Sequence, residues 1–119
     1  MKHNTVLTVT SLLSVLLLSL HVTDDVVRGF DPWGPSKLSF VVILAVWVYA
    51  TLFLTDRRWG LALIILGNLL SALMPVIHLR IGPKFMKTPG AFFFIWTIFA
   101  LGATGWLSVI LAARALRRA

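Results

Sequence analysis

Two histidines and two aspartates near the ends of long apolar segments are the residues of this chain best suited to chemistry. His21, Asp24 and Asp25 follow i, i+3 and i+4 spacing, which places the three side chains on one face of a helix. His78 ends a second apolar segment 57 residues further on. Two imidazoles and a carboxylate suit zinc, iron or manganese. The pattern therefore predicts a metal site formed by His21, His78 and Asp25.

Haem is an alternative cofactor for the same residues, with one histidine from each of two helices as its axial ligands. Arg28 would then balance the charge of a propionate, and Trp96 would line the ring. A plainer interpretation needs no cofactor. Histidines near lipid headgroups hydrogen-bond to water, and here Asp25 would simply pair with His21.

A repeated phrase indicates which elements position these side chains. Residues 12–16 read LLSVL and residues 69–73 read LLSAL, again 57 positions apart. Polar groups are costly in hydrocarbon, so the predicted stripes should turn inward and hydrogen-bond between helices. The pattern predicts two related helical hairpins whose histidines face each other. The expected stripes contain Ser11, Ser14 and His21; Tyr49; Asn68, Ser71 and His78; and Thr97, Thr104 and Ser108.

The composition is that of a membrane protein. Of the 119 residues 59% are hydrophobic and 13% charged, and four stretches of membrane length carry no charged residue. About 20 helical residues cross a hydrocarbon layer ~30 Å thick. We predict a single all-α domain of four transmembrane helices, with a kink at Pro75 in the third. The expected spans are residues 5–28, 37–56, 59–80 and 89–115.

Charge and cysteine content narrow the setting. The net charge of +7 comes from cations clustered at span ends, which favours contact with a lipid bilayer and not with nucleic acid. Six cations on the side of the termini against five on the other side favour cytoplasmic termini in a bacterial-type inner membrane. The first segment is expected to be a retained helix. The absence of cysteine excludes disulfides and thiol catalysis.

These features favour a non-catalytic membrane protein that binds a small hydrophobic ligand, cofactor or ion in a pocket near the outer leaflet. A homodimeric transporter or channel is the first alternative, because length and span number resemble those of small multidrug-resistance transporters and fluoride channels. The first span lacks the glutamate expected of such drug exporters, so neither family is assigned. A metal- or haem-dependent membrane enzyme or redox subunit, alone or in a larger membrane complex, is the second alternative. The predicted ligand contacts are His21, His78, Asp24, Asp25, Arg28, Ser14, Asn68, Ser71 and Trp96.

Overall fold

The computed structural model describes residues 3–27, 37–81 and 90–118, of which the side chains of residues 3, 4, 37 and 78–81 fall outside the description. These residues form four α-helices and no strand, which confirms the all-α prediction. Two helices end three residues away from the predicted position: α2 ends three residues earlier, and α4 ends three residues later. The helices are α1 (His3–Val27), α2 (Lys37–Phe53), α3 (Arg58–Ile81) and α4 (Ala91–Arg118).

Three of these helices are long and apolar enough to cross a membrane. Their candidate spans are Thr5–Val27, Arg58–Ile77 and Ala91–Arg118. The 17 residues of α2 extend about 25 Å at 1.5 Å per residue, which is short of a hydrocarbon layer ~30 Å thick. The helices fit a small integral membrane protein, and a fourth crossing by α2 stays a prediction.

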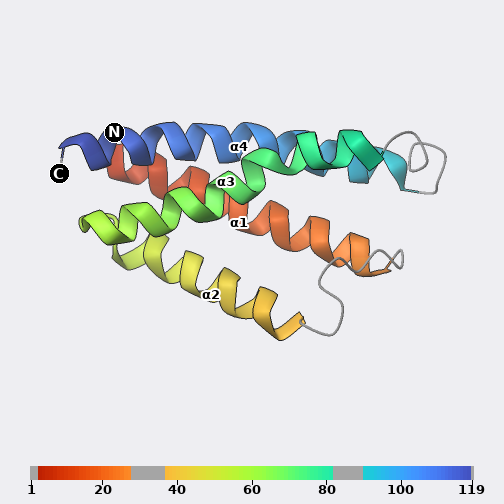
Figure 1. Ribbon diagram of the computed structural model, residues 1–119, viewed down its shortest axis with the longest axis horizontal. Coiled ribbons are helices and arrows are strands. Elements are labelled where there is room, and N and C mark those ends of the chain that lie inside the picture. Colours follow the sequence, from red (N-terminus) through yellow and green to blue (C-terminus); the bar gives the residue numbers. More distant parts are fainter. Residues whose placement is uncertain (1–2, 28–36, 82–89, 119) are drawn as a thin grey trace.

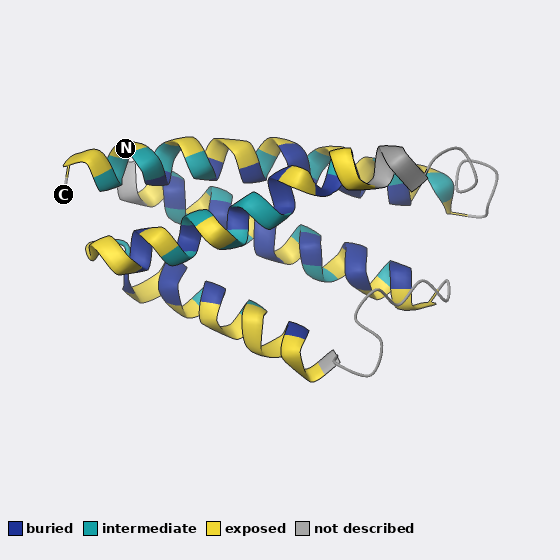
Figure 2. Cartoon of the chain, viewed as in Figure 1, coloured by how far each residue is buried: buried dark blue, intermediate teal, exposed yellow. Residues whose placement is uncertain are grey.

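The bundle has two distinct ends in Figure 1. α1 begins and α4 ends at the left of the view, which we call the near end, and the opposite end is the far end. α1 and α3 run from the near end to the far end, while α2 and α4 return. α4 packs along α3 and α1. The contacts of α2 are fewer, and they are mainly with α1 and α3. α2 is therefore the outlying helix, and most of its surface is exposed in Figure 2.

A tight turn at the near end joins α2 to α3. The backbone N–H of Arg57 donates to the carbonyl of Leu54 at 3.1 Å, so α2 ends before the charged residues that follow. A Cβ at Gly60 would collide with the carbonyl oxygen of Leu54. Glycine at this position thus lets α3 begin directly against the end of α2, and the two helices lie antiparallel as neighbours.

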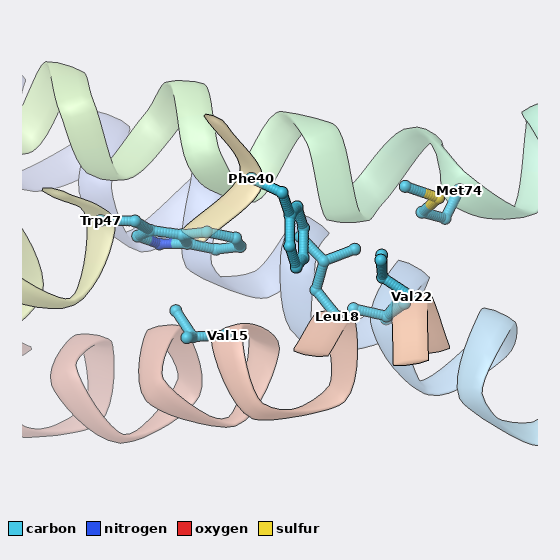
Figure 3. Close-up of a cluster of buried hydrophobic side chains, with 7 residues drawn as sticks. Val15, Leu18, Val22, Phe40, Trp47 and Met74 are labelled. Atoms are coloured by element: carbon cyan, nitrogen blue, oxygen red, sulfur yellow. The ribbon is translucent and has the colours of Figure 1, made fainter. Parts of the chain in front are cut away.

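Two clusters of buried apolar side chains hold the helices together. The near-end cluster draws on all four helices, and so does the middle cluster, most of which is shown in Figure 3. In the middle cluster Phe40 extends from α2 toward Leu18 and Val22 of α1 (Figure 3). The near-end cluster contains Leu7, Ala50, Leu54, Leu61, Ile64 and Ala112; the middle cluster contains Val15, Leu18, Val22, Phe40, Trp47, Met74 and Leu101.

Small residues allow α3 and α4 to approach closely. A Cβ at Gly105 would lie 2.6 Å from the backbone nitrogen of Ala72 and 2.8 Å from the carbonyl oxygen of Asn68. A Cβ at Gly102 would lie 2.7 Å from Cγ of Pro75. The backbone of α4 thus meets the backbone of α3 at Gly105 and the Pro75 ring at Gly102, as expected for glycine at membrane helix interfaces. The kink at Pro75 and the relation of the two hairpins as a repeat stay predictions.

Candidate functional site

The polar stripes of α1, α3 and α4 turn into the bundle, as their spacing predicted. The stripe residues Ser11, Ser14 and His21 of α1 are fully buried, and so are most of their described counterparts on α3 and α4. Thr104 of α4 is the exception, because it is half-buried and donates to the carbonyl of Ala100 in its own helix. The prediction was wrong for α2, where Tyr49 is 56% exposed. Trp47 and Thr51 supply the buried polar groups of α2 instead. The fully buried counterparts are Asn68 and Ser71 on α3, and Thr97 and Ser108 on α4.

Ser11 is the centre of a buried hydrogen-bond network that links three helices. Its Oγ accepts from Trp47 Nε1 at 3.1 Å and from Asn68 Nδ2 at 3.1 Å. A hydroxyl has one hydrogen and two acceptor positions, so Ser11 is left to donate to Thr51 Oγ1 at 2.9 Å. Thr51 in turn donates to the carbonyl of Trp47 at 2.8 Å. Each of these donor hydrogens therefore makes a hydrogen bond within the network. These bonds attach α2 to α1 at the level of Ser11.

The same network fixes the orientation of the Asn68 amide. Nδ2 donates to the carbonyl of Ile64 at 2.9 Å as well as to Ser11, and a carbonyl can only accept. Both amide hydrogens are therefore used, and Oδ1 points away from these partners. Ser11 and Asn68 are 57 positions apart, and the bond between them sets these two positions of α1 and α3 at one level.

His21 forms a second polar site toward the far end, between α1 and α4. Its side chain is 0% exposed, and its Nδ1 lies 2.9 Å from Thr97 Oγ1. Thr97 donates its only hydrogen to the carbonyl of Phe94 at 2.9 Å, so its oxygen accepts and His21 Nδ1 carries a proton. The Phe94 ring packs against the imidazole with a centroid distance of 5.1 Å.

The other imidazole nitrogen faces a carboxylate on the same helix. Nε2 of His21 lies 3.5 Å from Oδ2 of Asp25, and the Asp25 residue is only 5% exposed. A proton on either atom makes the contact attractive, because two bare lone pairs would repel each other. Asp24, one residue earlier, is half-buried beside this pair. The plainer interpretation expected this pair, but it also expected His21 to face water near the headgroups, whereas the side chain is fully buried in the bundle.

Two residues of the predicted histidine site fall outside the description. This applies to the side chain of His78 and to the whole of Arg28. The facing arrangement of the two imidazoles thus stays a prediction. In Figure 1 the far ends of α1 and α3 lie apart, and α3 ends beside α4.

The described side chains do not complete a metal centre. No group of three His, Cys, Asp or Glu side chains comes together among the residues that the structure describes. Trp96, predicted to line a cofactor, is 54% exposed and lies on the outer face of α4. It borders a shallow hollow of about 440 Å³ formed by α4 alone. The metal and haem interpretations therefore depend on the undescribed residues.

A larger apolar groove separates α1 from α2. It has a volume of about 670 Å³ and lies on a different face of α1 from Ser11, Ser14 and His21. No sequence pattern predicts this groove, because both of its walls are mostly apolar helix. The groove is lined by Leu12, Val15, Leu16 and Ser19 of α1 and by Val41, Leu44, Ala45, Val48, Tyr49, Leu52 and Phe53 of α2.

Comparison with known proteins assigns the chain to no family, because no family model, curated protein or solved structure matches it.

Proposed function

We propose that this small membrane protein binds a hydrophobic molecule in the groove between α1 and α2, without catalysis. The observation that carries the proposal is the groove itself. Its volume is about 670 Å³, it is open along its outer side, and its lining is almost wholly apolar. A lipid chain or a similar lipid-soluble compound matches that chemistry.

The packing of α2 explains why a groove is present. On the near-end side, hydrogen bonds of Trp47 and Thr51 to Ser11 hold α2 against α1. Beyond that point Phe40 packs into the middle cluster, on a different face of α2 from the groove residue Ala45. No interhelical hydrogen bond between α1 and α2 appears among the described residues on the groove side. The two helices therefore leave room between them.

Polar groups border the groove at separate depths. Ser19 lies toward the far end, and Tyr49 lies toward the near end. The Tyr49 ring packs on Phe53 with a centroid distance of 5.2 Å, which forms an aromatic wall at that end. A hydrophobic molecule with one hydrogen-bonding group would find a partner at either position. His21 and Asp25 hold α1 against α4 in this proposal and do not touch the ligand.

The proposal is tested by filling the groove. Ala45 is a small lining residue, and tryptophan in its place would occupy the space between the helices. We expect A45W to weaken binding of a photoactivatable diazirine fatty acid about tenfold, a loss of about 1.4 kcal/mol. Saturable photolabelling of the purified protein in bilayers, mapped by mass spectrometry, measures this.

Ala103 provides the matched control, since it is an exposed alanine on α4 and lies outside the groove lining. A103W should label like the parent protein. Labelling that does not saturate, or that A45W leaves unchanged, would show ordinary contact with bulk lipid and contradict a binding groove.

A further inference from the structure

Four polar oxygens in the middle of the bundle have no hydrogen-bond partner among the described residues. They are Ser14 Oγ, Asn68 Oδ1, Ser71 Oγ and Ser108 Oγ, and all four residues are fully buried. A buried polar group left unpaired costs about 1–3 kcal/mol, and hydrocarbon surroundings offer no relief. Four such groups in one small bundle require an explanation.

The register of the helices places these oxygens close together. The bond between Ser11 and Asn68 sets α1 level with α3, so Ser14 and Ser71 both lie one turn further toward the far end. Gly105 of α4 touches the backbone of α3 between Asn68 and Ala72.

Contacts between α1 and α4 give the same levels. His21 bonds to Thr97, and Leu18 shares a cluster with Leu101, so residue numbers in α4 fall as those in α1 rise. Continuing this pairing down the helices places Ser14 level with Gly105, and Ser11 level with Ser108. The four oxygens therefore lie within two adjacent turns of α1, α3 and α4.

We propose that this layer binds water inside the membrane-embedded bundle. A buried water makes about three hydrogen bonds to otherwise unpaired groups. Asn68 Oδ1 can only accept, while each serine hydroxyl can donate or accept, so one or two waters can satisfy all four oxygens.

Water fits this layer better than a cation does. The described carboxylates lie elsewhere: Asp24 and Asp25 are toward the far end, and Asp56 is in the near-end turn. Asp25 is 11 residues beyond Ser14 along α1, about 16 Å. A cation among neutral oxygens would be buried without a counter-charge, which is costly at such depth.

An apolar layer separates the proposed water from the His21 pair. Leu18, Met74 and Leu101 belong to the middle cluster, and Leu18 lies between Ser14 and His21 on the same face of α1. The water site is thus separated from the His21 pair, and it lies on a different face of α1 from the groove. It does not rest on the proposed function.

Solid-state NMR of the protein in deuterated-lipid bilayers tests the proposal through magnetisation transfer from water. We expect early transfer to Asn68 and Ser71 and slow transfer to Leu18 and Leu101. In the double variant S14A/S71A, the early signal at Asn68 should be lost. Ser19→Ala, on the groove face, is the matched control and should keep it.

Transfer to Asn68 in the parent protein as slow as that to Leu18 would overturn the proposal, because the serines would then bond to their own helix. An early signal that persists in the double variant would also overturn it, since the water would not depend on these hydroxyls. The measurement on the parent protein shows whether water lies beside Asn68 even if the double variant folds poorly.

Discussion

Replacing Gly105 by alanine is expected to destabilise the bundle, although alanine is the better helix former. Helix propensity alone would stabilise the variant by about 1 kcal/mol. The added Cβ, however, would lie 2.6 Å from the backbone nitrogen of Ala72, and backbone cannot move aside as a flexible side chain can. The two helices must separate, and overpacking of this kind costs about 1–3 kcal/mol. Unfolding in mixed micelles with added SDS, followed by circular dichroism, measures the difference.

Ala103→Leu is the control for this variant, because it adds bulk to an exposed position of the same helix. Its free energy of unfolding should match that of the parent protein. A G105A variant as stable as the parent, or more stable, would mean that α3 and α4 are not in backbone contact at this level.

Replacing Trp47 by alanine is expected to have the largest effect on stability. The indole is 2% exposed, it packs on Gly67, and its N–H donates to Ser11. Truncating a buried tryptophan typically costs about 3–5 kcal/mol, because a large cavity remains. The same unfolding measurement should show a loss of this size for W47A.

Two further variants separate the contribution of the Trp47 hydrogen bond from that of its buried packing. Trp47→Phe keeps most of the packing and removes the hydrogen bond, so it should cost only about 1 kcal/mol. Trp106→Ala removes an indole from the exposed face of α4 and should change stability by no more than about 0.5 kcal/mol. Equal losses of unfolding free energy for W47A and W106A would contradict the packing of the Trp47 side chain of α2 against α1 and α3.

Hydropathy and polar spacing were enough to predict the helices and the inward face of α1. A run of about 20 apolar residues has few alternatives to a helix in lipid, because the backbone must satisfy its own hydrogen bonds. Ser11, Ser14 and His21 share one face, and hydrocarbon favours burying that face. The same reasoning correctly placed Asn68 and Ser71 inside the bundle.

The orientation of α2 could not be predicted in this way, because the helix is largely apolar on all sides. In water, the hydrophobic face of a helix turns inward; in a membrane, lipid is as apolar as the core, so hydropathy does not select a face. Polarity alone predicts Tyr49 in the interior, whereas Trp47 and Thr51 take that role through their bonds to Ser11. The groove depends on the distance between α1 and α2. No pattern within either helix predicts that distance.

The His21 site was half predictable. Spacing along one helix placed Asp25 beside His21, since i and i+4 positions are neighbours. The bond to Thr97 joins residues far apart in the chain, and only the packing of α1 against α4 brings them together.

The inward orientation of the polar face of α1 is most directly tested by a spin-label scan of this helix. The chain has no cysteine, so single cysteines can be labelled along α1 in bilayers without background. Oxygen accessibility should be lowest at positions 7, 11, 14, 18 and 21 and highest at positions 9, 13, 16 and 20. Minima at the second set of positions would place the serines and His21 toward lipid and contradict the buried polar network.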